Sequence, residues 1–179
     1  QEYVKADPKL KSLLSLIKLN LVETKGMQDA FKTLGLQNTE VFPNARLADK
    51  SRTPVTHDGV LKCVFFSKIC EDKGVDYILS EFEDLEGITV DFYGHVDAGI
   101  KDRFEIFINT HSNATYRGVF DAAKNDVYAE LSKYDVLLLP TKWKGEGVPG
   151  ILVETKMTGI TAIVSDMNYN AEIVQDGVE

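Results

Sequence analysis

Two glutamates, Glu146 and Glu154, lie at the two ends of the short stretch GVPGILV. A carboxylate accepts hydrogen bonds through both oxygens and suits a pair of vicinal hydroxyl groups. The stretch between the glutamates predicts a helix that begins near Pro149, and a helix start carries free N–H groups that favour an anion such as phosphate. Acids around an anion site indicate a ligand with hydroxyl groups on both sides of its phosphates, as in a nucleotide sugar.

Two lysines follow a predicted buried strand at residues 60–66 and supply positive charge for the same anion. Lys68 comes almost directly after the strand, and Lys73 stands next to Gly74, which allows close approach of the backbone. His95 ends another predicted strand and is a candidate for the sugar phosphate, with an ordinary surface role as the equal alternative. No group of His, Cys, Asp or Glu has metal-ligand spacing, so the sequence predicts no catalytic metal.

A repeating pattern of strands and helices must position these residues. Predicted strands cover residues 60–66, 88–94, 114–120, 135–140 and 160–166, and predicted helices cover 75–85, 124–134, 150–159 and 170–177. Asn125 is the expected N-cap of the second of these helices, and residues 100–110 fit either type. Alternation at this spacing predicts a parallel sheet covered on both faces, with ligands at the carboxyl ends of its strands.

A different pattern precedes these elements. Residues 9–20 and 25–35 predict two helices, and residues 39–47 predict a strand that ends at a Pro-Asn turn. The polar stretch of residues 47–59 predicts a linker, because it contains proline and glycine and has no apolar periodicity. We therefore expect the chain to have two parts.

Three longer stretches, SKICEDKGVDYILSEF, GVFDAAKNDVYAELSKYDVLLLPT and EGVPGILVETKMTGITAIVSD, resemble the donor-binding lobe of the retaining GT-B glycosyltransferases of family 4. The resemblance covers about residues 61–179, and NTEVFPNARL is weakly similar to the end of the acceptor lobe. It implies an α/β fold, with a Rossmann-like parallel sheet that has helices on both faces. Residues 1–55 would be the tail of the N-terminal acceptor lobe plus the linker. Residues 56–179 would be the nucleotide-sugar-binding C-terminal lobe, truncated at its end.

The resemblance also implies roles for single residues. Glu146 matches the family's glutamate near the transferred sugar, which makes it the candidate catalytic residue, and Glu154 matches the glutamate that binds the ribose. The other matches are Lys68, Lys73, Gly147, Val148, Pro149 and Gly150 for the donor diphosphate, and the backbone of Gly118, Val119 and Phe120 for the base.

Two departures from the family pattern affect these roles. Ser67-Lys68 replaces the usual Gly-Arg and loses the bidentate fork of arginine. Val148-Pro149 replaces the usual Phe-Gly, which alters the loop that touches the sugar and indicates a different choice of donor.

The activity that the resemblance implies is transfer of a hexose, with retention, from a UDP- or GDP-sugar. The acceptor would be a glycan or a lipid-linked molecule in polysaccharide or glycoconjugate biosynthesis, bound through the missing N-terminal lobe. No cofactor is expected, and this fragment alone is expected to be inactive. Two alternatives stay open: a non-catalytic nucleotide-binding module of the same fold, and a phosphorylase-like enzyme that uses inorganic phosphate. Trp143 is a candidate for facing the acceptor, with local packing as the alternative.

The charge of the chain argues against nucleic acid as a partner. The chain carries 20 Lys and Arg against 28 Asp and Glu, a net charge of -8, whereas nucleic-acid binding depends on neutralising phosphates. No apolar run reaches the roughly 18 residues of a membrane span, and the first residues have no signal-peptide pattern. We expect a cytoplasmic location, with peripheral association of the full-length protein at the membrane surface left open.

Overall fold

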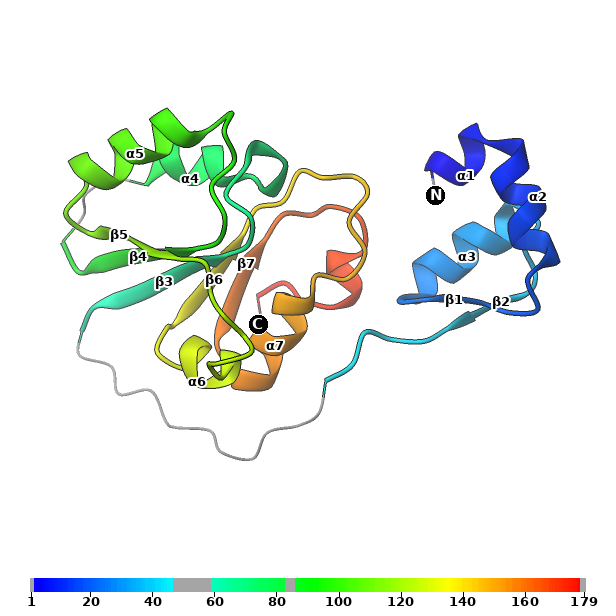
Figure 1. Cartoon of the computed structure of the whole chain (residues 1–179). Helices are drawn as coiled ribbons and strands as arrows, with labels where there is room; N and C mark the ends of the chain where they lie inside the picture. The colour runs from blue at the N-terminus through cyan, green and yellow to red at the C-terminus, as the bar shows by residue number, and fades with distance from the viewer. Residues whose placement is uncertain (1, 47–58, 83–85, 178–179) are drawn as a thin grey trace.

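Five parallel strands form the sheet of the larger part of the chain (Figure 1). The computed structural model describes residues 2–46, 59–82 and 86–177. We call the described residues within 59–177 the larger unit and residues 2–46 the smaller unit. The strands are β3 (Leu61–Phe66), β4 (Ile88–Tyr93), β5 (Ala114–Gly118), β6 (Val136–Leu139) and β7 (Thr161–Val164), in the spatial order β5-β4-β3-β6-β7. Every neighbouring pair is parallel, so the predicted sheet is confirmed.

Helices cover both faces of this sheet because successive strand side chains point to opposite sides. On one face lie α4 (Val75–Glu81) and α5 (Lys101–Thr110), and on the other lie α6 (Val127–Leu131) and α7 (Gly150–Thr158) (Figure 1). Buried phenylalanines pack with valines and isoleucines on the first face, and leucines pack with two tyrosines on the second. The phenylalanines are Phe65, Phe92, Phe104 and Phe107, the leucines are Leu131, Leu137, Leu139 and Leu152, and the tyrosines are Tyr93 and Tyr134. The predicted α/β fold class is therefore confirmed.

The strand order creates a crevice at one edge of the sheet. From β3 the chain adds β4 and β5 on one side, and it then crosses to add β6 and β7 on the other side. The connections after β3 and β6 therefore leave in opposite directions, which opens a space between the carboxyl ends of these two strands. The segments that follow β3 and β6 carry most of the residues that the sequence singles out.

The smaller unit is a β-α-β motif with two preceding helices. Its elements are α1 (Glu2–Ala6), α2 (Pro8–Leu16), β1 (Asn20–Val22), α3 (Lys25–Thr33) and β2 (Thr39–Val41). β1 and β2 pair in parallel, and the Thr24 hydroxyl caps α3 by accepting the Met27 N–H at 3.2 Å. The expected boundary after residue 55 and residues 47–58 of the predicted linker lie outside the described residues.

Several helices differ from the predicted ranges. Residues 101–110 form α5, and α4 ends at Glu81, with the predicted residues 83–85 outside the described part. The helix predicted over residues 124–134 is shorter. Its N-cap is Asp126 rather than Asn125, because the Asp126 carboxylate accepts the Tyr128 N–H at 2.8 Å while Asn125 donates to the Asp121 carbonyl.

The helix predicted over residues 170–177 is also shorter in the structure. It is reduced to the 3₁₀-helix η2 (Asn170–Glu172). The Asn170 side chain donates to the Ser165 carbonyl at 3.0 Å, and the Lys156 ammonium donates to the Ile173 carbonyl at 2.6 Å. These bonds hold the segment in a turn against α7 and take up a carbonyl that a longer helix would use.

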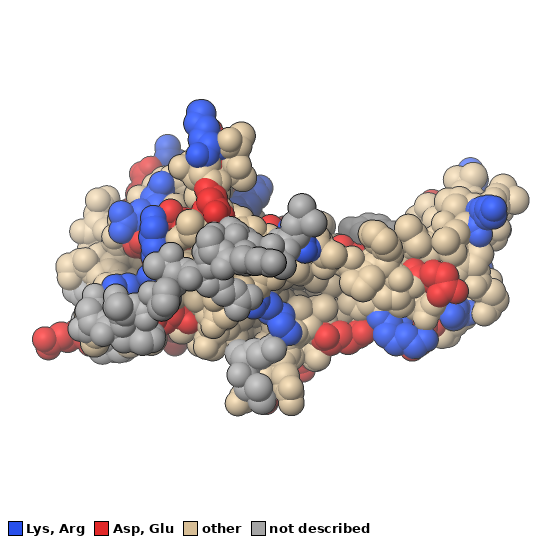
Figure 2. All heavy atoms as spheres, turned by 90° about the horizontal axis from the view of Figure 1, so that it is seen from below, with Lys and Arg blue, Asp and Glu red and all other residues tan. Residues whose placement is uncertain are grey.

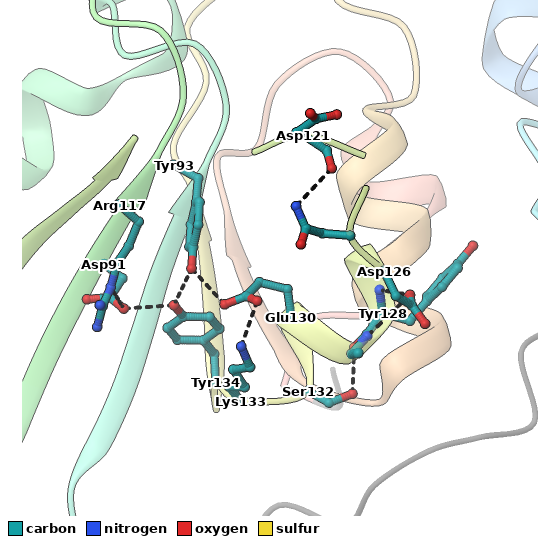
Figure 3. A network of polar contacts seen from close by, with 12 residues as sticks. Asp91, Tyr93, Arg117, Asp121, Asp126, Tyr128, Glu130, Ser132, Lys133 and Tyr134 are labelled. Atoms are coloured by element: carbon teal, nitrogen blue, oxygen red, sulfur yellow. Dashed lines mark hydrogen bonds and ion pairs between the residues drawn. The ribbon is translucent and has the colours of Figure 1, made fainter. Parts of the chain in front are cut away.

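A polar network lies on the sheet face beside α6 (Figure 3). We call it the sheet network, and its members are Asp91, Tyr93, Arg117, Glu130, Lys133 and Tyr134. Asp91 accepts from Arg117 Nε and from the Tyr134 hydroxyl, both at 2.7 Å. Glu130 accepts from the Tyr93 hydroxyl and from Lys133, also at 2.7 Å. Burial raises the pKa of Tyr134 well above its ordinary value and that of Tyr93 to about 12, so both hydroxyls stay protonated.

Charged side chains are spread over the surface. Figure 2 shows Lys and Arg interspersed with Asp and Glu among the described residues of one face. Several form exposed ion pairs along helices, such as Lys25 with Asp29 at 2.8 Å, each contributing less than about 1 kcal/mol. In the ranges that the structure describes, no helix has the length and apolar character needed to cross a lipid bilayer.

Candidate functional site

A close approach of the backbone brings Lys73 to the crevice between β3 and β6. Lys73 ends the 3₁₀-helix η1 (Glu71–Lys73), and Gly74 follows with a φ of 72°. A Cβ atom at Gly74 would collide with the carbonyl oxygen of Pro140, directly after β6. Glycine is needed there because it tolerates the positive φ and leaves room for Pro140. The predicted Lys73-Gly74 pair therefore places Lys73 beside the loop of residues 141–149.

Lys73 and Glu146 form a largely buried ion pair in this crevice. The Lys73 ammonium contacts one oxygen of Glu146, and the Thr141 hydroxyl donates to the other oxygen at 2.6 Å. The two side chains are only 16% and 10% exposed, and the Lys73 nitrogen lies 5.1 Å from the ring centroid of Trp143. Water screens charges weakly at such a depth, so the two side chains attract each other more strongly than an exposed pair would.

The helix α7 carries the second predicted glutamate. It begins at Gly150 with Pro149 as its N-cap residue and ends before Gly159, as the sequence predicts. Glu154 lies in its second turn and accepts a hydrogen bond from Arg46 Nε at 2.8 Å. This hydrogen bond raises the pKa of Arg46. Arg46 belongs to the smaller unit, so α7 is one place where the two units meet.

Glu23, also from the smaller unit, holds the loop before α7. Its carboxylate accepts the Val148 N–H at 2.7 Å, and the Asn44 side chain donates to the Val148 carbonyl at 3.1 Å. The sequence analysis identified neither Glu23 nor Arg46. They are separated from their partners by 125 and 108 residues, and their one local signal is that they follow β1 and β2 at the carboxyl ends of parallel strands.

Lys68 and His95 lie apart from the Lys73–Glu146 pair. Lys68 pairs with Asp97 at 2.5 Å, and both side chains are about half exposed. The hydrogen bond from Lys68 lowers the pKa of Asp97, and His95 is an exposed neighbour of the same aspartate. Among the described residues, no ion pair joins Lys68 to Glu146. The structure thus brings Lys73 and Glu146 together and leaves Lys68 with a different acid.

The segment predicted to contact a base follows β5. Gly118 ends the strand with a φ of 83°, and Val119 is 66% exposed. The Phe120 ring packs against Phe66 with 5.2 Å between centroids, so its side chain belongs to the core. The backbone of residues 118–119 lies at the same carboxyl edge as the other candidates, because Gly118 pairs with Tyr93 at the end of β4.

A cleft of about 970 Å³ lies between the two units, beside Glu146. Its lining combines aromatic and apolar side chains with four charged ones, Asp72, Lys142, Lys144 and Glu146, so it offers both apolar surface and polar groups to a small molecule. It includes Val22, Met27 and Phe31 from the smaller unit, and Trp143, Glu146, Gly147 and Tyr169 from the larger unit. In the described part of the chain, no group of three His, Cys, Asp or Glu side chains is arranged to hold a metal ion.

Comparison with known families gives one match. The model of the family described as "Glycosyl transferases group 1" matches residues 61–179. No curated protein is significantly similar to the sequence.

Solved structures share this fold at low sequence identity. The lipopolysaccharide outer core galactosyltransferase WaaB has a TM-score of 0.75 at 16% identity, over 97% of this chain and 50% of that chain. HepE from Anabaena, in complex with UDP and glucose, has a TM-score of 0.62 at 14% identity, over 96% and 53%. A trehalose-6-phosphate structure from E. coli bound with UDP-2-fluoro glucose has a TM-score of 0.67 at 14% identity, over 96% and 52%. The chain therefore spans about half the length of these proteins.

Proposed function

Because the chain belongs to the glycosyl transferases group 1 family, we propose that the full-length protein transfers a sugar from a nucleotide-diphosphate sugar to an acceptor. The observation that carries this proposal is the buried Lys73–Glu146 pair in the crevice that precedes α7. A cation, a helix start and carboxylates in one place offer partners both for a diphosphate and for sugar hydroxyls.

Each of these groups has a proposed role in the transfer. Negative charge grows on the diphosphate as its bond to the anomeric carbon breaks, and Lys73 stabilises that charge together with the N–H groups at the start of α7. Glu154 accepts from the ribose hydroxyls, and Glu146 fixes Lys73 and orients the transferred sugar. The configuration at the anomeric carbon is retained. Because Lys73 and the α7 start supply positive charge, the proposal includes no metal ion.

The proposed donor is a UDP-sugar, ahead of a GDP-sugar. Two chains that share the fold are described as bound to UDP with glucose and to UDP-2-fluoro glucose. The proposed acceptor is a glycan or lipid-linked sugar that enters the cleft beside Trp143, which places the reaction in polysaccharide or glycoconjugate synthesis. Aromatic rings present a flat apolar face, which suits the C–H faces of a pyranose.

The test is a donor screen with the full-length protein. UDP-, GDP- and ADP-sugars are each supplied with a panel of glycan and lipid-linked acceptors, and release of the nucleoside diphosphate is measured. We expect turnover with one nucleotide class, loss of that turnover in Glu146→Ala, and no effect of a chelator. A protein whose melting temperature and turnover respond to none of these donors would contradict the proposal.

Two other outcomes of the same screen identify the alternative functions. Binding of a nucleotide without turnover with any acceptor would indicate a non-catalytic module. Activity on a glycan with inorganic phosphate and no nucleotide would indicate a phosphorylase-like enzyme.

A further inference from the structure

Glu23 brings a carboxylate from the smaller unit against the loop before α7. It follows β1 directly, and Thr24 fixes the backbone beside it by capping α3. The carboxylate accepts the Val148 N–H at 2.7 Å. A Cβ atom at Gly147 would collide with this carboxylate, so Glu23 reaches its place only because residue 147 has no side chain.

Glu23 and Glu146 differ in the hydrogen bonds that they still have to offer. Both oxygens of Glu146 are engaged, one by Lys73 and the other by Thr141. Within the described ranges, the Val148 N–H is the single hydrogen-bond donor to Glu23, whereas a carboxylate has about four lone-pair sites. Glu23 therefore has more lone pairs left for hydroxyl donors than Glu146 has.

The space around this loop is open on both sides of the contact. Gly147 lines the cleft of about 970 Å³ that also contains Glu146. Glu23, Asn44 and Val148 line a smaller cavity of about 220 Å³. The peptide between Gly147 and Val148 therefore borders both spaces, the one that contains Glu146 and the one that contains the acid in contact with this peptide.

We propose that Glu23 positions and selects the transferred sugar by accepting hydrogen bonds from its hydroxyl groups. This inference rests on the function proposed above and adds a residue from the smaller unit to the donor site. The contact falls on Val148, where the sequence departs from the family resemblance. A site built to accept a particular hydroxyl discriminates against a sugar that places this group elsewhere, because the polar partner is then left unpaired.

The test uses the full-length protein with Glu23→Gln and, as a matched control, Glu172→Gln. Glu172 also joins the two units by accepting a backbone N–H, that of Gly26 at 3.0 Å, and it lines the same smaller cavity. Among the described residues, no hydrogen bond joins Glu172 to the loop before α7. UDP affinity is measured by calorimetry, and kcat/KM is measured for UDP-glucose and UDP-galactose. We expect Glu23→Gln to lower kcat/KM for the preferred sugar roughly 10- to 100-fold and to change the ratio between the two epimers. UDP affinity should stay unchanged, and Glu172→Gln should leave the ratio unchanged.

Other results overturn the proposal in distinguishable ways. Equal weakening of UDP and UDP-sugar binding, shared by Glu172→Gln, would mean that Glu23 only joins the units. Tighter UDP binding by Glu23→Gln would mean that Glu23 competes with the diphosphate. Glu23→Asp serves as a second variant if the first does not fold, with an altered epimer ratio again the expected result. A wild-type protein that neither binds UDP nor uses UDP-sugars would instead overturn the proposed function.

Discussion

Two polar networks of the molecule contain the same kinds of residue. The sheet network lies within the larger unit, whereas the other, which we call the crevice network, joins both units. The crevice network consists of Glu23, Arg46, Lys73, Glu146 and Glu154. The sheet network lies within one unit, and each of its carboxylates has a cation: Asp91 has Arg117, and Glu130 has Lys133. The crevice network joins both units through Arg46 and Glu23. Among the described residues, Glu23 has no ion-pair partner at all.

This difference separates a network that stabilises the fold from one that is suited to bind a ligand. The buried tyrosines of the sheet network stay protonated and donate to acids of the same unit, so their bonds are complete without a ligand. Both networks border a cavity, of about 440 Å³ at the sheet network and about 970 Å³ at Glu146. The acids and cations of the crevice network also converge on a loop and a helix start, whose free N–H groups suit an anion. The comparison predicts that substitutions in the crevice network lower turnover. Substitutions in the sheet network should lower the stability of the fold and leave turnover unchanged.

The largest effect on this comparison should come from Glu146→Gln in the full-length protein. The substitution keeps the size of the side chain and removes the charge that holds Lys73. We expect turnover at 25 °C to fall roughly 100- to 1000-fold, measured as the initial rate of nucleoside diphosphate release. The melting temperature should fall as well, because the largely buried Lys73 ammonium loses its partner. Glu105→Gln, on the exposed side of α5, should keep wild-type turnover. Normal turnover in Glu146→Gln would remove this residue from the site.

A smaller effect, on the affinity for UDP, is expected for Glu154→Ala. Loss of a carboxylate that accepts from ribose hydroxyls should weaken UDP binding roughly 10- to 100-fold, measured by calorimetry. The substitution also leaves Arg46 without its partner, so Arg46→Ala is measured in parallel to separate the two contributions. Unchanged UDP affinity in Glu154→Ala would exclude the ribose role.

Tyr134→Phe tests the role of the sheet network in stability. It removes the hydroxyl that donates to Asp91 and leaves the Arg117 pair in place. We expect the free energy of unfolding to fall by about 1–2 kcal/mol, measured by urea denaturation, while turnover at 25 °C stays normal. A loss of turnover without a loss of stability would show that the two networks are coupled.

The smallest expected effect is the change that Glu130→Gln makes in the pH dependence of stability. Burial by itself would raise the pKa of Glu130, but hydrogen bonds from Lys133 and Tyr93 bring it below the ordinary 4.5. A lowered pKa in the folded state means that Glu130 stabilises the fold above pH 4.5 and loses this contribution as the pH falls below that value. Glu130→Gln should therefore narrow the difference in stability between pH 7 and pH 4 by less than about 1 kcal/mol, measured by urea denaturation. An unchanged difference would contradict this prediction.

The parts of the fold that depend on local pattern could be predicted from the sequence. The five strands of the larger unit and α7 were placed within a few residues, because apolar runs and the terminal Gly159 mark them directly. In the smaller unit, β1 was not predicted, and β2 ends at Val41 rather than at residue 47. The cap of α6 was misplaced by one residue. Asn125 and Asp126 are both suitable caps by type, and the choice depends on which side chain the backbone presents to the first turn.

The candidate site was predicted only where its residues are close in sequence or belong to a pattern. The sequence singled out Glu146, Glu154 and the Lys73-Gly74 pair as candidates, and the structure adds the reason for the glycine in its close approach to Pro140. Glu23 and Arg46 were missed because their roles depend on how the two units dock, which no local pattern records. Lys68 was identified by its charge, its place after the strand and the family resemblance. Its exposed pair with Asp97 could not be foreseen without the turn that follows β3.

The distance in sequence between Glu23 and Val148 has a consequence for the order of folding. The contact spans 125 residues, and contacts of long range form late because they close a large loop. During synthesis the smaller unit leaves the ribosome first, and at typical elongation rates its partner loop follows roughly 6 to 25 s later. During this interval, the surface of the β-α-β motif that contacts the loop before α7 stays exposed. A chain that stalls between residues 46 and 147 would present that surface to chaperones or to other nascent chains.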